Sequence, residues 1–233
     1  MRAIIMAGGK GERLRPYTTV IPKPLMPIGN VAILEVVIIR LKNAGFEKIT
    51  IAVGYLGNLI EAYVGDGSRF GVQIDFVYEN KPLSTIGPLA YISNLNETFL
   101  VTNGDVLTDI SYEELLSFHK KVGANATIAT YKRNVKIDFG VLTYNDEFCI
   151  DGFIEKPEYN YNVSMGVYIF EPSILDYIEK GKPYGVDSLV LDMVEKKDKI
   201  FSYLFEGYWL DIGRPDDYEI AINKFLSEAQ SFI

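Results

Sequence analysis

Residues 1–27, MRAIIMAGGKGERLRPYTTVIPKPLMP, join an apolar run to a glycine-rich turn. The run RAIIMA at 2–7 is short, apolar and partly β-branched, which predicts a buried strand. Three of the four residues at 8–11 are glycine, so the backbone can turn tightly and bring its N–H groups against an anion. A strand followed by such a turn predicts an α/β fold with a phosphate-binding loop at the carboxyl end of its first strand.

The same segment concentrates positive charge in a chain whose formal net charge is -8. Its first 34 residues contain five basic side chains and one acidic one: Arg2, Lys10, Arg13, Arg15, Lys23 and Glu12. Arg13 can hold phosphate oxygens through a bidentate guanidinium. Lys23 stands between Pro22 and Pro24, so it offers a point charge on a restricted backbone. The alternative is an ordinary glycine turn with solvated charges nearby.

Two common phosphate motifs do not fit this loop. The dinucleotide-binding fingerprint G-x-G-x-x-G lacks its third glycine, because Arg13-Leu14 occupies that place, and Pro16 prevents an immediate long helix. The P-loop string G-x-x-x-x-G-K-[ST] does not occur. The loop is therefore predicted to be a phosphate cradle of another kind.

The rest of the chain alternates between strand-like and helix-like segments up to about residue 120. The predicted elements there are a helix at 33–44, a strand at 48–54, a helix at 57–67, and strands at 73–79 and 97–105. Strand–helix alternation at this spacing indicates βαβ units and a mostly parallel sheet. Beyond it, strands are predicted at 126–132, 139–145, 148–155 and 162–170, and helices at 173–181, 186–197 and 215–230. We therefore predict one domain, residues 1–233, with a Rossmann-like mixed, mostly parallel sheet flanked by helices and a small antiparallel lobe.

Composition places the chain among ordinary globular proteins, since 48% of its 233 residues are hydrophobic and 23% are charged. No apolar stretch approaches the ~20 residues of a membrane-spanning helix, and the N-terminus lacks a signal-peptide pattern. The acidic balance disfavours a nucleic-acid partner, and the single cysteine, Cys149, suits a reducing compartment. We expect a cytoplasmic protein without membrane or nucleic-acid partners.

Asp105 ends the strand predicted at 97–105, directly after Gly104. Carboxylate oxygens at the end of a buried strand could hold Mg²⁺ against reacting phosphates. The alternative is a turn or helix-capping aspartate. Asp109 is the better candidate for a cap, because the next predicted helix begins near Ser111.

Three further side chains, Asp211, Cys149 and His119, stand in contexts that predict their positions. Asp211 stands between Trp209-Leu210 and Gly213, which predicts a position inside a cleft. Cys149 is expected within a strand as a small core residue. His119, late in a predicted helix, is expected at the surface. Neither Cys149 nor His119 is therefore assigned to catalysis.

The pattern G-G-x-G-x-R-L-x-P-x-T-x-x-x-P-K-P-L, present from Gly8 to Leu25, resembles the signature of sugar-1-phosphate nucleotidylyltransferases. Later segments resemble that family in the same order: ILEVVIIRLKNAGF, VTNGDVLTD, FGVLTY, FIEKPE, SMGVYIFEP and GYWLDIGRPDDYEIA. The resemblance covers nearly the whole chain and implies the nucleotide-diphospho-sugar transferase fold. It also implies the reaction of an NTP with a sugar 1-phosphate to give an NDP-sugar and pyrophosphate, with Mg²⁺, in nucleotide-sugar and polysaccharide biosynthesis.

Carried over residue by residue, the resemblance assigns roles to both halves of the chain. The nucleotide-binding part, about 1–120, would use Ala7, Gly8, Gly9, Gly11, Glu12, Arg13, Glu79, Gly87 and Asp105. The sugar-phosphate-binding part, about 121–233, would use Gly140, Glu155, Lys156 and Ser164 together with Lys23. The catalytic residues would be Arg13, Lys23, Asp105 and Lys156, and the metal ligands Asp105 and Asp211. Ser164 departs from the asparagine common in the family, and a charged hairpin end is the other interpretation of Glu155 and Lys156.

The segment PLSTIGPLA (82–90) resembles that of mannose-1-phosphate guanylyltransferases and their short heptose-1-phosphate relatives. Ser84 and Ile86 stand where those enzymes usually have glycine and alanine. We therefore favour GTP and a mannose- or heptose-type sugar 1-phosphate, with thymidylyl, uridylyl or cytidylyl transfer as the alternative. The length leaves no room for the C-terminal domain of bifunctional members, and we expect a monomer or homodimer. Two other classes stay open: a glycosyltransferase, although the D-x-D motif is missing, and a non-catalytic nucleotide-sugar sensor.

Overall fold

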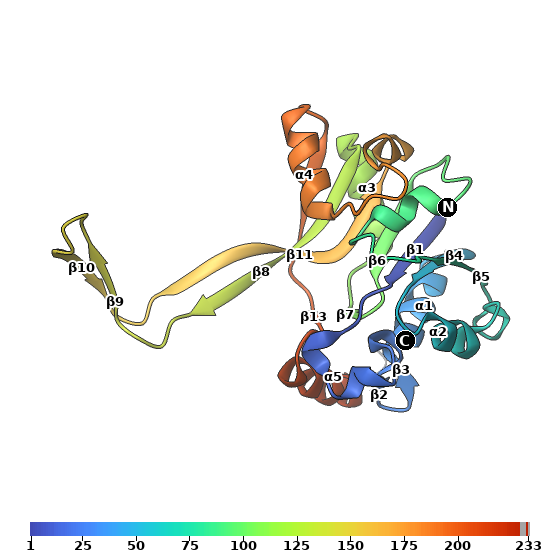
Figure 1. The fold of residues 1–233 in the computed structure, drawn as a ribbon, viewed down its shortest axis with the longest axis horizontal. Coiled ribbons are helices and arrows are strands. Elements are labelled where there is room, and N and C mark those ends of the chain that lie inside the picture. The colour runs from blue at the N-terminus through green and yellow to red at the C-terminus, as the bar shows by residue number, and fades with distance from the viewer. Residues whose placement is uncertain (229–231, 233) are drawn as a thin grey trace.

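In the computed structural model, which describes residues 1–228 and Phe232, a seven-stranded sheet runs through the body of the molecule (Figure 1). Its order is β12-β8-β11-β6-β1-β4-β5. The strands are β1 Arg2–Ala7, β4 Lys48–Val53, β5 Gln73–Tyr78, β6 Phe99–Asn103, β8 Ala126–Lys136, β11 Glu158–Phe170 and β12 Ile200–Phe205. β11 runs antiparallel to both of its neighbours, and the other pairs in this sheet are parallel. The predicted mixed, mostly parallel sheet is confirmed.

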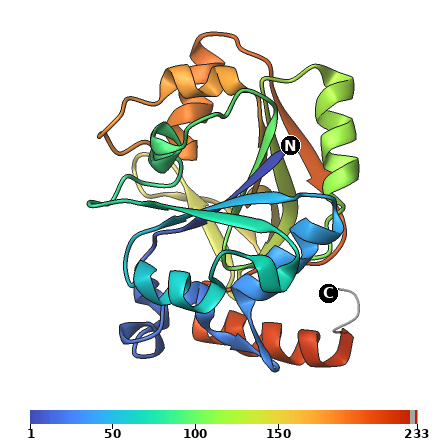
Figure 2. The same ribbon diagram turned by 90° about the vertical axis from the view of Figure 1, so that its right-hand side faces the viewer.

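Helices cover both faces of the sheet. They are α1 Ile33–Asn43, α2 Gly57–Val64, α3 Tyr112–Val122, α4 Val186–Glu195 and α5 Pro215–Glu228. Successive β1 side chains point to opposite faces: Ile5 packs in one cluster with α1, α2 and α3, whereas Ile4 packs in another with α4. Figure 2 shows α2 (teal) and α4 (orange) on opposite sides of the sheet. A third apolar cluster joins α1 to α5, and no helix among the described residues is long and apolar enough to cross a membrane.

Most of the predicted elements occur, with altered ends. The predicted helix at 173–181 is wrong, because only a 3-10 turn forms at Pro172–Tyr177 before the backbone becomes extended at Ile178. The strand predicted at 97–105 ends at Asn103, which leaves Gly104-Asp105 in a turn before β7 Val106–Thr108. The remaining short strands are β2 Pro27–Ile28, β3 Val31–Ala32 and β13 Trp209–Asp211. The predicted helix 215–230 forms as far as Glu228, and its last two positions lie outside the described residues.

The predicted antiparallel region forms, but as an arm rather than a packed lobe. Here the arm means residues 131–163, which comprise the outer parts of β8 and β11 and the hairpin β9 Val141–Tyr144 with β10 Ile150–Ile154. Figure 1 shows the arm projecting from the body with β9 and β10 at its tip. Cys149 lies exposed in this hairpin, so its predicted place in the core is wrong. The reason is that no helix or strand of the described body packs over the hairpin.

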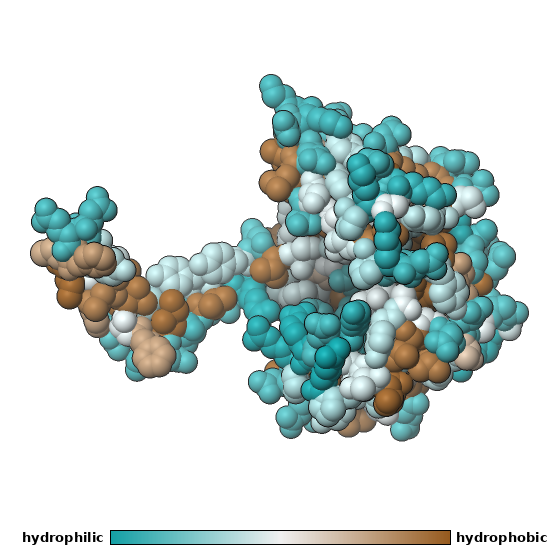
Figure 3. All heavy atoms as spheres, in the orientation of Figure 1, coloured by the Kyte–Doolittle hydropathy of each residue, from teal (hydrophilic) through white to brown (hydrophobic). Residues whose placement is uncertain are grey.

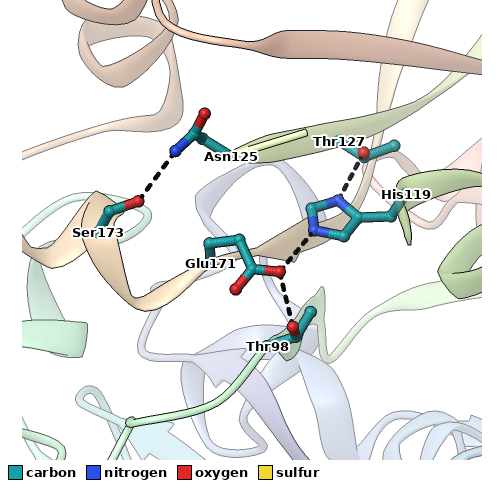
Figure 4. A network of polar contacts seen from close by, with 6 residues as sticks. All are labelled: Thr98, His119, Asn125, Thr127, Glu171 and Ser173. Carbon is teal, nitrogen blue, oxygen red and sulfur yellow. Dashed lines mark hydrogen bonds and ion pairs between the residues drawn. The ribbon is translucent and has the colours of Figure 1, made fainter. Parts of the chain in front are cut away.

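The predicted surface position of His119 is also wrong. Its side chain is only 1% exposed, and Figure 4 shows its ring between Thr127 and Glu171. Nδ1 lies 2.7 Å from the Thr127 hydroxyl oxygen and Nε2 lies 3.1 Å from Glu171 Oε1. Thr98 donates a 2.6 Å hydrogen bond to the same Glu171 oxygen, so the network ties α3 to β8 and to the end of β11. Burial of the ring lowers the pKa of His119, against the opposing effect of the Glu171 carboxylate.

This network predicts an acid-sensitive step in stability. The unfolded imidazole has a pKa near 6.5 and the folded one lies lower, so between the two values the unfolded chain binds more protons. The contribution of His119 is therefore complete above about pH 6.5 and is lost as the pH falls toward the folded pKa. We expect the unfolding free energy to fall between pH 7 and 5.5, by at most about 1.4 kcal/mol per pH unit.

Urea unfolding of the wild type and of His119→Gln across this range measures the step. The chain contains one histidine, and the carboxyl groups with raised pKa persist in the variant. The difference in slope therefore isolates the imidazole. Equal slopes in the two proteins would contradict the assignment.

The predicted helix cap at Asp109 is wrong as well. The Ser111 hydroxyl accepts a 3.2 Å hydrogen bond from the Glu114 N–H and is the N-cap of α3. The Asp109 carboxylate instead accepts a 2.8 Å bond from the Tyr208 N–H. Asp109 therefore connects β7 to the segment that leads into β13.

Candidate active site

The ends of β1, β4, β5 and β6 meet at the carboxyl edge of the sheet. Gly8, Gly54, Glu79 and Asp105 follow these strands, which is the place where open α/β sheets bind ligands. A cavity of about 790 Å³ opens there. Its lining residues are Met6, Gly8, Gly9, Lys10, Ala52, Gly54, Tyr55, Glu79, Asn80, Lys81, Pro82, Leu83, Ser84, Thr85, Pro88, Asn103 and Asp105.

Glu79 holds one wall of this cavity against the glycine loop. A Cβ placed on Gly8 would lie 1.9 Å from Glu79 Oε1, and one on Gly54 would lie 2.9 Å from the Gly8 carbonyl oxygen. Gly54 therefore needs to be glycine, because the Gly8 oxygen is backbone, whereas Gly8 faces the end of a flexible side chain. Glu79 Oε2 accepts a 3.0 Å hydrogen bond from the Leu83 N–H, and burial raises the pKa of Glu79 against that bond. The carboxylate thus fastens the loop that lines the cavity to the end of β5.

A second cavity, of about 370 Å³, shares Met6, Gly9 and Asp105 with the first. Its other lining residues are Ala7, Gly11, Glu12, Arg13, Lys23 and Pro24. Gly11 has φ +61°, and its carbonyl accepts a 2.8 Å bond from the Thr18 hydroxyl. This turn directs the chain from the first strand around the cavity and back to Lys23. The two cavities therefore adjoin along Met6, Gly9 and Asp105, and we treat them together as one candidate site.

Lys23 lies between two carboxylates. Its Nζ forms an ion pair with Asp105 and lies 3.6 Å from Asp211 Oδ1. The antiparallel pair of β7 and β13 sets Asp211 opposite Val106, and the Ile212 N–H donates a 3.3 Å bond to the Asp105 carbonyl. Residues 106 positions apart in the chain are therefore fixed as neighbours by one short ladder.

The electrostatics at this point suit a cation. The pKa of Asp105 is raised, and burial is the largest cause of the shift. The Lys23 ammonium opposes this shift, whereas the Asp211 carboxylate adds to it. Two carboxylates already share one ammonium, so a divalent cation would find hard oxygen ligands here. Among the described residues no cluster of three or more His, Cys, Asp or Glu side chains could hold a metal ion. A metal held by this pair would therefore take its remaining ligands from water and from substrate oxygens.

Removing the shared ammonium is expected to destabilise the fold. Lys23→Met leaves Asp105, whose side chain is 19% exposed, beside Asp211 without a compensating charge. The loss should cost about 1–3 kcal/mol of unfolding free energy, because water solvates both carboxylates only in part. Urea unfolding in EDTA measures this loss. The matched control is Lys182→Met, because Lys182 pairs with Glu179 at an exposed site and its loss should change stability by less than about 0.5 kcal/mol. Equal stability of the Lys23 variant and the wild type would contradict the charge arrangement.

Arg13 lies close to the second carboxylate. A Cβ placed on Gly213 would lie 3.2 Å from Arg13 Nη2 and 3.2 Å from Asp211 Oδ2. The guanidinium and the carboxylate therefore border the same glycine. Arg13, Lys23, Asp105 and Asp211, which the sequence analysis singled out, lie together in the structure.

The remaining predicted site residues lie elsewhere. Gly140, Glu155 and Lys156 gather on the exposed arm, where a Cβ on Gly140 would lie 3.3 Å from Glu155 Oε2, and none of them lines either cavity. Ser164 stands at the base of the arm with its hydroxyl 3.0 Å from that of Tyr168. Gly87 is buried, and its N–H donates to the Tyr184 carbonyl at 2.9 Å.

Several residues that line the larger cavity were not predicted, among them Tyr55, Lys81 and Asn103. Tyr55 follows the end of β4 and Asn103 is the last residue of β6. The rule that ligands bind beyond the carboxyl ends of the strands would have located both. Lys81 stands in the irregular segment after β5, and nothing in its local sequence distinguished it.

Comparisons with known proteins agree with this geometry. The family model described as "Nucleotidyl transferase" matches residues 2–228. The mannose-1-phosphate guanyltransferase of Schizosaccharomyces pombe is 36% identical over 97% of this chain and 65% of its own length. The mannose-1-phosphate guanylyltransferase catalytic subunit beta of Drosophila pseudoobscura pseudoobscura is 35% identical over 97% of this chain and 62% of its own. The chain thus spans somewhat less than two thirds of the length of these relatives.

A solved structure resembles the chain over its whole length. Two crystal structures of HddC from Yersinia pseudotuberculosis, one of them complexed with GMP-PN, match with TM-scores of 0.73 and 0.72. Sequence identity is 26%, and the match covers 96% of this chain and 99% of HddC.

Proposed function

The chain belongs to the nucleotidyl transferase family, and on this premise we propose that it transfers a nucleotidyl group from an NTP to a sugar 1-phosphate. The observation that carries the proposal is the pair of adjoining cavities that share Met6, Gly9 and Asp105. The larger cavity has room for a base and ribose, and the smaller one is lined by Arg13 and Lys23. Nucleotide and anion thus have adjoining places at the carboxyl edge of the sheet.

The reaction asks the protein mainly for positioning and charge neutralisation. An oxygen of the sugar phosphate attacks the α-phosphorus, and the bond from that phosphorus to the β-bridging oxygen breaks to release pyrophosphate. The attacking oxygen is already anionic, so no side chain has to remove a proton. We assign Arg13 and Lys23 to the charge that accumulates on the phosphates, with backbone N–H groups of the glycine loop as further donors.

We assign Asp105 and Asp211 as ligands of Mg²⁺. Their hard carboxylate oxygens and their shared cation support this choice. When bound, the ion would neutralise phosphate charge. Lys23 would keep the two carboxylates together when the ion is absent.

The proposed substrates are GTP and a mannose- or heptose-type sugar 1-phosphate. The relatives named above are mannose-1-phosphate guanylyltransferases, and the HddC complex contains GMP-PN. The segment 82–90, which resembles that of mannose-1-phosphate guanylyltransferases, lines the larger cavity through Pro82, Leu83, Ser84, Thr85 and Pro88. We infer that this segment contacts the base. Glu155, Lys156, Gly140 and Ser164 are proposed for the sugar phosphate.

We further propose that the described chain is one functional unit, with a nucleotide-binding part at about 1–120 and a sugar-phosphate part beyond it. A cytoplasmic location without a nucleic-acid partner fits the acidic composition and the exposed free thiol of Cys149.

A substrate matrix tests the proposal. Pyrophosphate release would be followed in Mg²⁺ and in EDTA while GTP, ATP, CTP, UTP and TTP are crossed with mannose, glucose and heptose 1-phosphates. We expect GTP with a mannose- or heptose-type substrate to exceed other pairs by about 10²-fold in kcat/KM, because a base is selected through hydrogen bonds. EDTA should abolish the signal. If the protein binds a nucleotide but turns over none of the substrate pairs, the proposal is overturned in favour of a nucleotide-sugar sensor.

A further inference from the structure

The arm leaves the body as a two-stranded ribbon with little cover. β8 and β11 stay paired without interruption from Thr130↔Ser164 to Lys136↔Glu158. Most side chains of this ribbon are exposed, on both faces, and Figure 3 shows it standing clear of the body. A two-stranded ribbon is marginally stable in water unless something packs against it. The arm therefore lacks a packing partner among the described residues of its own chain.

The tip of the arm is apolar. Phe139 is 77% exposed and Phe148 is 79% exposed. Leu142, Ile150 and Phe153 add to the same exposed surface, and Figure 3 shows apolar side chains gathered along the arm. Contiguous exposed apolar surface of this kind marks an interaction site.

A second exposed apolar surface borders the candidate site. Tyr17, Val20 and Ile21 are all exposed in the loop that runs from the glycine turn to Lys23. Lys23 itself touches Asp105. The body thus presents apolar side chains beside its charged centre, as the arm presents them beside Glu155 and Lys156. The two surfaces could cover each other, and the charged groups next to them would then meet.

The direction of the arm is fixed where it leaves the sheet. The register of β8 and β11 shifts between Ser164 and Tyr168, and Gly166 in that irregularity has φ +74°. The Trp209 indole N–H donates a 2.9 Å bond to the Met165 carbonyl and so ties this point to β13. This bond and the uninterrupted ladder of β8 with β11 hold the arm in its projecting direction, with Glu155 and Lys156 outside both cavities of their own chain. A second chain can receive the arm as it stands.

We propose that the arm docks on a second copy of this chain around a two-fold axis, so that Glu155 and Lys156 of each copy complete the carboxylate site of the other. The apolar tip of each copy would cover the 17–21 loop of the other copy. Such exchange of one element between identical chains closes a symmetric dimer. The proposal rests on the proposed function for the role of Lys156, and on the structure alone for the docking.

Complementation of two inactive variants tests the shared site. Two variants would be co-expressed with different tags and purified as the heterodimer: Lys156→Ala, expected to lose at least about 10²-fold in kcat, and Asp105→Asn, expected to lose at least about 10³-fold. One of its two sites then combines an intact arm with an intact body. We expect about half of the wild-type kcat per dimer, because one site in two is complete. Activity no higher than that of either parent would overturn the proposal.

Crosslinking tests the docking without any use of activity. Cys149 is the only cysteine and is exposed near the tip, so a maleimide photocrosslinker attaches there in the wild-type protein. Subunits labelled with ¹⁵N and ¹⁴N would be mixed, crosslinked and digested. We expect peptides that join a heavy arm to a light 17–23 segment. The docking would be overturned if the joined peptides carry one isotope only, or if no peptides link these segments. If mixed-isotope peptides form but the wild-type protein is inactive, only the proposed function is overturned.

The mass in solution provides a matched control. Phe139→Ser with Phe148→Ser should convert the dimer to a monomer in sedimentation equilibrium. Leu191→Ser removes an equally exposed apolar side chain from α4, 70% exposed, and should leave the dimer intact. A monomeric wild type, or a dimer unaffected by the arm variant, would contradict the proposal.

Discussion

Asparagine in place of Asp105 is expected to lower kcat by at least about 10³-fold while the fold remains intact. The substitution keeps the size of the side chain and removes the charge that Lys23 and the proposed Mg²⁺ both need. Asp105 is also the residue at which the two cavities meet, so no other described carboxylate occupies an equivalent place. Initial rates of pyrophosphate release at saturating substrates measure the loss.

The control for this variant is Asp176→Asn, since Asp176 lies exposed in the 3-10 turn at Pro172–Tyr177. It should retain wild-type turnover. Circular dichroism and urea unfolding would establish that the Asp105 variant is folded. A folded Asp105→Asn protein with near-normal kcat would remove Asp105 from the mechanism.

Alanine in place of Arg13 is expected to reduce kcat/KM by about 10²- to 10³-fold. Arg13 lines the smaller cavity and borders Gly213 beside Asp211, so its guanidinium is positioned for a phosphate oxygen. Its charge-assisted bonds would strengthen as charge builds on the departing pyrophosphate, and the loss should therefore appear mainly in kcat.

Arg15→Ala is the matched control, because Arg15 lies two residues away and its guanidinium forms an exposed 3.8 Å ion pair with Glu12. Its removal tests whether general positive charge in the loop is sufficient. We expect less than about a 3-fold change from this exposed pair. If Arg13→Ala and Arg15→Ala lose kcat/KM equally, Arg13 has no specific role and acts only through the general positive charge of the loop.

The centre of the candidate site could be predicted because its determinants are local. A glycine turn, an aspartate after a strand and a lysine between prolines each follow from a few neighbouring residues. The pairing that brings Asp211 to Asp105 is not local. The apolar neighbours of Asp211 predicted a position inside a cleft, whereas its side chain is 40% exposed and lines neither cavity. The short ladder of β7 and β13 is too brief to predict from side-chain alternation.

The arm and His119 could not be predicted for a different reason. The alternating pattern of a strand is the same whether its outer face meets a lobe, a second chain or water. The pattern in residues 126–170 therefore predicted antiparallel strands, but not that they project as an arm. His119 is buried because Thr127 and Glu171, from other elements, satisfy both of its ring nitrogens. The helix sequence around it contains neither partner. Burial of a polar side chain depends on such distant groups.

The central claim, transfer of the α-phosphoryl with its nucleoside, is tested most directly by the fate of labelled phosphorus. GTP labelled at either the α or the γ position with ³²P would be incubated with Mg²⁺ and mannose 1-phosphate, and the products separated. We predict that the α label enters a nucleotide sugar and that the γ label leaves, in equal amount, as pyrophosphate. A γ label found on the sugar or as orthophosphate would contradict the account, because the bond broken would then be the one between the β- and γ-phosphates.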